Sequence, residues 1–142
     1  MSGILLDTNA LVWFASGDPM DPYALSAIAS AQEASLVFVS PISAWEAALA
    51  ARKRNNQPNL SGLAPSAWFK AALALPGVRM VTVNRRIALE AASVPPVYGN
   101  GDPGDCFLIA TARIRKLRIV TRDGAMIGLS QVNPSYLQTI PC

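Results

Sequence analysis

Short apolar runs that alternate with helical segments constrain the fold of this chain most. Four such runs suit buried strands of a parallel sheet, at residues 4–6, 36–39, 78–83 and 118–121. The segments between them show helical spacing of apolar residues and are long enough to serve as crossover connections. Strands that alternate with helices predict an α/β fold with a mainly parallel sheet. The length of 142 residues favours one domain, residues 1–142.

Capping residues and prolines mark where the helices begin. The helices are expected at about 9–16, 23–33, 42–54, 65–75, 85–93, 103–116 and 125–127. The third of them is predicted to bury an apolar face that includes Ile42, Trp45 and Leu49. Residues 94–103 are rich in proline and glycine, and we expect an irregular loop that could form the wall of a site. A last edge strand is expected at 137–140.

The sequence contains no histidine, which excludes several classes of catalytic site. Histidine-based triads, zinc sites with histidine ligands and an imidazole general base all need that side chain. Cys106 and Cys142 match no zinc or redox spacing, so we expect two reduced cysteines. Acid–base or metal chemistry in this chain must therefore use carboxylates, hydroxyls, lysine or water.

The composition suggests an apolar chain with anionic partners. The sequence is 51% hydrophobic, and its mean hydropathy is +0.29. No apolar run is long enough to cross a membrane, and the first residues do not resemble a signal peptide. We therefore expect a cytoplasmic protein without a membrane partner, whose surplus apolar surface is covered by a partner or a second copy. The net charge of +3 favours anionic partners.

Two carboxylates directly follow predicted strands. Asp7 comes after the strand at 4–6, and Asp123 comes just past the end of the strand at 118–121. Ligands of open α/β sheets bind at the carboxyl ends of the strands, so both acids are candidate site residues. Only nine residues of the chain are acidic, and two others, Asp18 and Asp21, are explained as turn and cap residues.

Two further carboxylates can reach the same edge of the sheet. Glu46 lies in the helix that follows the second strand, within an apolar stretch that argues against full exposure. Asp105 lies in the first turn of a helix that Asp102 caps. Four converging carboxylates would repel one another unless a cation neutralised them. Ligands that are all oxygen favour Mg²⁺ or Mn²⁺, and such an ion suits phosphodiester hydrolysis.

Four sequence blocks, in order along the chain, resemble PIN-domain ribonucleases, and most closely the VapC toxins of bacterial toxin–antitoxin pairs. The blocks are residues 5–11, 40–46, 101–105 with 108–112, and 120–123. The resemblance implies a three-layer α/β/α sandwich with a central, mainly parallel sheet of four to five strands. It also implies a metal-dependent endoribonuclease that uses Mg²⁺ or Mn²⁺, cuts RNA such as tRNA or rRNA, forms a homodimer and is held inactive by a small VapB-like antitoxin.

The resemblance carries over to individual residues. The members of the acidic quartet, catalytic and metal-binding, correspond to Asp7, Glu46, Asp105 and Asp123. Asn9 and Thr121 match polar residues that brace the quartet, and Asp102 matches a second acid in its block. The chain departs from the family pattern at Cys106, where arginine is frequent, and at Asn100–Gly101, where a histidine-containing pair is frequent. These departures concern contacts with RNA or antitoxin and leave the quartet intact.

Basic residues outside the acidic group are candidates for RNA phosphate contacts. They are Arg52, Lys53, Arg54, Arg85, Arg86, Arg113, Arg115 and Lys116. Cations near helix ends also suit the helix dipole, which is the alternative explanation for several of them. Two other functions remain open. One is a non-catalytic PIN-fold module that binds RNA or protein. The other is a phosphatase with Asp7 as nucleophile, although Asn9 stands where such enzymes usually have a second acid.

Overall fold

The computed structural model describes residues 3–142. Within these residues, five strands form one sheet in the order β3-β2-β1-β4-β5, and all neighbouring strands are parallel. The strands are β1 (Ile4–Leu6), β2 (Val37–Val39), β3 (Val78–Met80), β4 (Arg118–Thr121) and β5 (Thr139–Pro141). The predicted parallel sheet is confirmed, and the predicted last strand lies at its edge beside β4.

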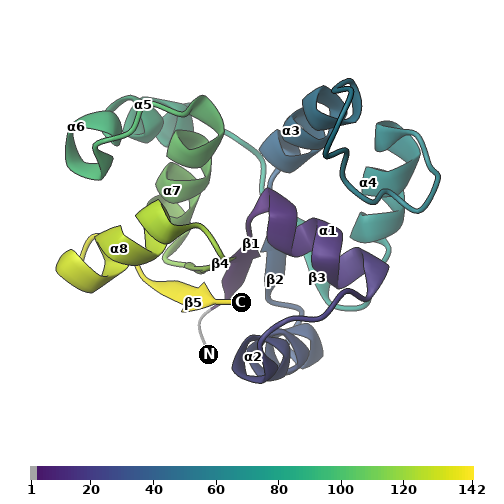
Figure 1. Ribbon diagram of the computed structural model, residues 1–142. Helices are drawn as coiled ribbons and strands as arrows, with labels where there is room; N and C mark the ends of the chain where they lie inside the picture. Colours follow the sequence, from purple (N-terminus) through teal and green to yellow (C-terminus); the bar gives the residue numbers. More distant parts are fainter. Residues whose placement is uncertain (1–2) are drawn as a thin grey trace.

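Eight helices lie within the same residues (Figure 1). They are α1 (Thr8–Ser16), α2 (Pro22–Glu33), α3 (Pro41–Ala51), α4 (Pro65–Leu73), α5 (Arg85–Ala92), α6 (Pro95–Tyr98), α7 (Pro103–Arg115) and α8 (Gly124–Val132). In this described part of the chain, no helix has the length and apolar character needed to span a membrane. The predicted caps Asp21, Ser40, Asn84 and Asp102 all accept hydrogen bonds from the first turns of their helices.

The helices cover both faces of the sheet and make a three-layer α/β/α sandwich, as predicted. Helices α1 to α4 lie on one side and α5 to α8 on the other (Figure 1). Alternate residues of each strand belong to different cores. Ile4 and Leu6 of β1 pack with α1 and α2, whereas Leu5 packs with α5 and α7. The strands β1 and β2 are therefore buried on both faces, which explains their continuous apolar runs, whereas the edge strand β3 is partly exposed.

The strand order places a crevice between β1 and β4. The chain adds β2 and then β3 on one side of β1, and later adds β4 and β5 on the other side. Helices that follow β1 and β4 leave in different directions at such a switch point, so the carboxyl ends of the two strands border an opening. Asp7 and Asp123 follow these two strands.

Several predicted boundaries are corrected by the structure. Residues 94–103 are not wholly irregular, since they contain α6, whose prolines fix the backbone angle of its first turn. The last helix extends to Val132 rather than Ile127, because Met126 and Leu129 continue its packing against the core. Helix α3 ends at Ala51 rather than Arg54, and β3 ends at Met80 rather than Val83.

The predicted apolar face of α3 is wrong. Trp45 and Leu49 are 46% and 44% exposed, whereas the helix buries Ser43 and Ala47. Helix α3 contacts α1 and α7 as well as α4, and small side chains allow close approach between helices where large ones would not fit. The large apolar residues of α3 therefore point outward and leave an apolar surface uncovered.

Gly77 is required at a close approach between two segments, and we expect Gly77→Ala to destabilise the fold strongly. Its φ is +73°, and an added Cβ would lie 2.5 Å from Cα and 2.8 Å from the carbonyl carbon of Gln32. Gly62 is the matched control, since its φ is +74° and an added Cβ would meet nothing within 4 Å. We expect Gly62→Ala to cost about 1 kcal/mol of unfolding free energy and Gly77→Ala about 3 kcal/mol or more. If denaturant unfolding showed equal losses of unfolding free energy for the two variants, the steric overlap with Gln32 would be contradicted.

Candidate metal centre

An acidic cavity of about 310 Å³ lies at the carboxyl edge of the sheet. Its walls bring together all four members of the predicted quartet with five other residues. It is lined by Asp7, Thr8, Asn9, Trp13, Glu46, Asp105, Leu108, Arg122 and Asp123. These residues come from the ends of β1 and β4 and from α1, α3 and α7. The cavity therefore gathers carboxylates that are far apart in the sequence.

Asp7 is the most deeply buried acid of the cavity, with 7% of its surface exposed. Its Oδ1 accepts a hydrogen bond of 2.8 Å from the N–H of Ala10, so it also caps α1. Burial raises the pKa of Asp7, and the charge of Asp123 raises it further. Hydrogen bonds from Thr121 and Ala10 oppose this rise in the pKa. Removing Asp7 from water therefore costs the protein free energy in the absence of a cation.

Glu46 is held by a short chain of hydroxyl groups. The Thr8 hydroxyl donates to Glu46 Oε1 at 2.5 Å, and its oxygen lies 3.0 Å from Oγ of the fully buried Ser43. Burial raises the pKa of Glu46, and the charges of neighbouring acids raise it further, while the bond from Thr8 lowers it. An added Cβ at Gly104 of α7 would lie 2.6 Å from Glu46 Cδ. Gly104 therefore leaves the space that the carboxylate fills.

Asp105 receives a hydrogen bond that the sequence did not predict. The phenol of Tyr98, at the end of α6, donates to Asp105 Oδ2 at 2.8 Å. Burial raises the pKa of Asp105 to about 6, and the charges of Asp102, Asp123 and Asp7 contribute, although the bond from Tyr98 lowers it. The segment predicted as a site wall thus supplies a direct contact to the site.

Asp102 and Asp123 are exposed helix caps beside the other acids of the cavity. Asp102 Oδ1 accepts the N–H of Asp105 at 3.2 Å, and Asp123 Oδ1 accepts from the first turn of α8 at 2.8 and 3.0 Å. The buried Thr121 accepts the N–H of Asp123 at 2.9 Å, so it contacts this acid and Asp7. Asn9 is exposed and lines the cavity.

The carboxylate oxygens of this cluster are suitable ligands for a hard divalent cation. Glu46, Asp102 and Asp105 can each place one carboxylate oxygen within 4.8 Å of the others. Oxygens that bind one Mg²⁺ or Ca²⁺ ion at roughly 2.0–2.6 Å have comparable separations. Asp7 and Asp123 line the same cavity, outside this closest group. Carboxylates whose burial and mutual repulsion raise their pKa values are the groups that a bound cation would stabilise in their charged form.

The raised pKa values predict an unusual pH dependence of stability. The metal-free folded protein binds protons at Asp7, Glu46 and Asp105 more tightly than the unfolded chain does. This contribution to the free energy of unfolding is complete below about pH 4, the ordinary carboxyl pKa, and is lost as the pH rises through the Asp105 pKa of about 6. When a chelator keeps the protein free of metal, urea unfolding should therefore give a lower free energy of unfolding at pH 7.5 than at pH 5. Asp105→Asn should reduce that difference, and an unchanged difference would contradict the assignment.

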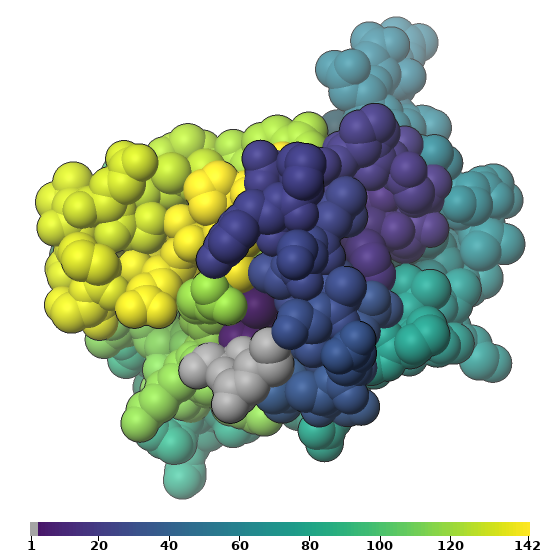
Figure 2. Space-filling view, turned by 90° about the horizontal axis from the view of Figure 1, so that it is seen from below, coloured from purple at the N-terminus to yellow at the C-terminus, as the bar shows by residue number. Residues whose placement is uncertain are grey.

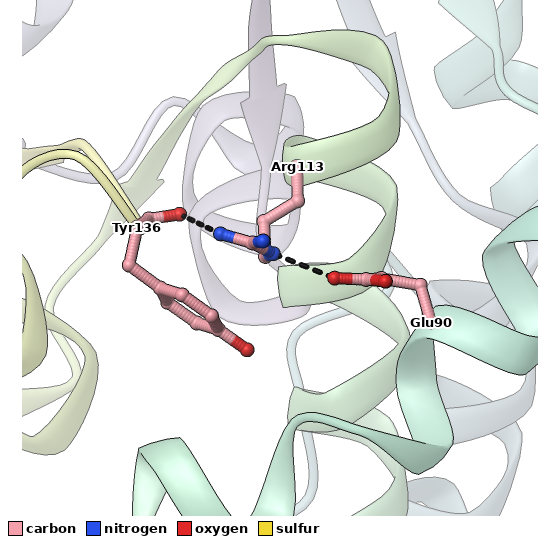
Figure 3. Close-up of polar contacts among 3 residues, drawn as sticks. All are labelled: Glu90, Arg113 and Tyr136. Atoms are coloured by element: carbon pink, nitrogen blue, oxygen red, sulfur yellow. Dashed lines mark hydrogen bonds and ion pairs between the residues drawn. The ribbon is translucent and has the colours of Figure 1, made fainter.

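The predicted RNA-binding residues lie outside the acidic cavity. Arg113 forms an ion pair of 2.7 Å with Glu90, donates to the Tyr136 carbonyl at 2.8 Å and lies over the Tyr136 ring (Figure 3). It therefore ties α7 to α5 and to the segment before β5. Arg115 and Lys116 lie at the same C-terminal end of α7, just before β4. The remaining candidates are exposed after α3 or in the first turn of α5, at Arg52, Lys53, Arg54, Arg85 and Arg86.

Sequence reasoning assigned no role to Trp13 and Arg122, which line the cavity. Arg122 directly precedes Asp123 at the end of β4, so the strand-end argument that selected the acid could also have selected the cation. The role of Tyr98 was missed because its contact with Asp105 depends on where α6 lies relative to the start of α7.

Several solved structures resemble this fold. DNA-bound VapBC from Salmonella typhimurium is 16% identical, with 99% of this chain and 98% of that chain covered and a TM-score of 0.66. VapBC2 from Rickettsia felis, bound to a promoter DNA fragment, is 13% identical, with 98% of both chains covered and a TM-score of 0.67. A toxin–antitoxin complex from Klebsiella pneumoniae is 22% identical, with 85% and 87% covered and a TM-score of 0.56.

No curated protein matches the chain by sequence. The family model of the PIN domain does match it, over residues 4–130. The matched range contains both strands that end at the cavity and all the acids that line it. Most of the sequence therefore fits this one family model, and the chain belongs to the PIN domain family.

Proposed function

We propose that this protein is a metal-dependent endoribonuclease toxin of a VapBC-like, type II toxin–antitoxin pair. The main support is the single cavity in which Asp7, Glu46, Asp105 and Asp123 converge on a PIN fold. The structural resemblance to toxin–antitoxin complexes favours the same assignment. As a toxin of this kind, the protein would act in the cytoplasm.

The proposed metal ligands are the quartet Asp7, Glu46, Asp105 and Asp123, with Asp102 as a possible fifth contact. The all-oxygen donor set favours Mg²⁺, with Mn²⁺ as the alternative. A bound ion of this type supplies Lewis acidity toward a phosphodiester and lowers the pKa of a water molecule. The protein itself orients the carboxylates, with Thr8 on Glu46 and Tyr98 on Asp105. Asn9 supports the group from the first turn of α1, and Thr121 supports it from the end of β4.

The proposed substrate is RNA, such as tRNA or rRNA, bound largely through its phosphates. The candidates exposed to solvent for such contacts are Arg52, Lys53, Arg54, Arg85, Arg86, Arg115 and Lys116. Arg113 is less suited, because Glu90 and Tyr136 already occupy its guanidinium group. RNA binding should weaken as the salt concentration rises, since phosphate contacts release counterions.

Purified protein tests the activity directly. We expect it to cleave total tRNA or rRNA in Mg²⁺ and to lose cleavage in EDTA, with recovery when Mg²⁺ or Mn²⁺ is returned. Sequencing the 5′ ends of RNA fragments after induction in cells would identify the substrate. Binding of RNA without cleavage under any of these metal conditions would instead favour a non-catalytic PIN-fold module.

The proposed protein partners are a VapB-like antitoxin and a second copy of the chain. Trp45 and Leu49 lie one turn apart on α3 and expose apolar surface that such a partner could cover. Cells expressing the protein alone should stop growing, and co-expression of the antitoxin should restore growth. Equal growth in both cases would contradict the toxin assignment. Size-exclusion chromatography with light scattering would test the homodimer.

A further inference from the structure

We propose that Arg122, held in place by Trp13, binds a backbone phosphate of the RNA strand at the rim of the acidic cavity. This inference rests on the proposed function and assigns one substrate-binding contact to that site. Both residues line the same cavity as the four acids. Arg122 is the one lysine or arginine among the cavity-lining residues of the described chain, 3–142.

The guanidinium group of Arg122 is fixed by three contacts. Its Cζ lies 3.8 Å from the centre of the Trp13 ring. Its Nε donates to the main-chain oxygen of Cys142 at 3.1 Å, and its Nη2 donates to the carbonyl of Pro19 at 3.4 Å. Figure 2 shows a dark blue N-terminal segment lying against the yellow C-terminal segment, and the bonds of Arg122 to Pro19 and Cys142 join these two parts of the chain. A cation held in this way loses little conformational freedom when it binds an anion.

Arg122 retains unused capacity to bind an anion. A guanidinium group carries five N–H donors, and the two hydrogen bonds to main-chain oxygens use only part of them. Among the described residues, the one ion pair between side chains within 4.0 Å joins Arg113 to Glu90, so no aspartate or glutamate pairs directly with Arg122. Arg122 is also exposed, so a ligand can reach it from solvent.

An approaching RNA strand needs such a cation. The carboxylates of the cavity repel phosphate groups, and a metal ion would offset only part of their charge. A planar guanidinium matches the geometry of phosphate oxygens and can contact two of them at once. Contact with the backbone carries no base information, so Arg122 should strengthen binding to RNA of any sequence. Trp13 orients the guanidinium and acts as a positioning residue.

RNA binding by a non-cleaving protein tests this role. The reference protein is the non-cleaving Asp7→Asn variant. The probe is a fluorescein-labelled, 20-nucleotide stem-loop RNA, and its binding is measured by fluorescence anisotropy. Adding Arg122→Gln should weaken binding about tenfold and reduce the slope of log affinity against log salt by about one. Arg79→Gln is the matched control, because Arg79 is also exposed and also lies over an aromatic ring, that of Phe38, but does not line the cavity. It should change affinity less than twofold.

Arg122→Lys separates phosphate binding from a purely structural role. Lysine keeps the charge but cannot reproduce the planar contacts, so it should recover part of the lost affinity and of the salt slope. Circular dichroism and thermal unfolding of each variant show that binding is measured on folded protein.

The proposed phosphate site is wrong if Arg122→Gln binds RNA as tightly as the reference protein does, or if Arg79→Gln weakens binding equally. It is also wrong if the affinity of Arg122→Lys is no higher than that of Arg122→Gln. If the reference protein binds RNA and Arg122→Gln binds it equally well, only the phosphate site is rejected. If the reference protein itself binds no RNA, both the proposed function and the phosphate site fail.

Discussion

Asp7→Asn should abolish RNA cleavage while preserving the fold. Asparagine caps a helix about as well as aspartate, so the bond from Ala10 to this side chain is retained. The loss of a negatively charged metal ligand should lower the cleavage rate about 100-fold or more, since even residues that only support metal ligands contribute roughly 10–100-fold. The substitution also removes a buried charge whose pKa is raised by burial. Metal-free Asp7→Asn should therefore unfold at a temperature no lower than the parent at pH 7.5.

Asp21→Asn is the matched control for Asp7→Asn. Asp21 also caps a helix and also accepts a hydrogen bond from the first turn, but it lies outside the acidic cavity. Asp21→Asn should cleave RNA at the parental rate. The assignment of Asp7 is contradicted if Asp7→Asn cleaves RNA at the parental rate in Mg²⁺, or if both variants lose activity to the same degree.

Gly104→Ala should reduce activity strongly without weakening the fold. The new methyl group would take the space of the Glu46 carboxylate, which lies at the end of a side chain that can rotate away. Alanine also has a higher helix propensity than glycine, by up to about 1 kcal/mol, so stability should be unchanged or slightly higher. Displacing Glu46 from the site should lower the cleavage rate by about 10- to 100-fold, the range typical of residues that support a metal site.

Gly101→Ala controls for a substitution in the same segment. An added Cβ at Gly101 would meet nothing within 4 Å, so cleavage should remain near the parental rate. Thermal unfolding and cleavage should be measured together on both variants. If Gly104→Ala retains full activity, Glu46 does not take part in the site as the geometry indicates. If it loses activity only in proportion to a loss of folded protein, the effect is one of stability.

Much of the fold could be predicted because its determinants are local. The run that forms β1 is wholly apolar, β4 has Ile119 and Val120 at its centre, and each strand is followed by an acid that caps the next helix. The order of strands and helices then brings the strand ends to one edge of the sheet. For this reason, the sequence alone was enough to predict that Asp7 and Asp123 lie close together.

The remaining features depend on neighbours that are distant in the sequence. The periodicity of α3 indicated that Trp45 and Leu49 are buried, but close packing against α1 and α7 selects the small residues instead. The contact of Tyr98 with Asp105 requires α6, which the prolines of its sequence had suggested to be irregular. The stacking of Arg122 on Trp13 joins the end of β4 to α1, and no local pattern reports it.

Binding of a divalent cation tests the central claim most directly. Isothermal titration with Mn²⁺ and Mg²⁺ at pH 7.5 should show saturable binding to the metal-free parent. Asp7→Asn and Gly104→Ala should weaken the affinity about tenfold or more, in line with the range for residues that support metal sites, while Asp21→Asn and Gly101→Ala should not. Folded parent protein that binds neither ion at millimolar concentration, or an Asp7→Asn variant that binds as well as the parent, would contradict the metal centre.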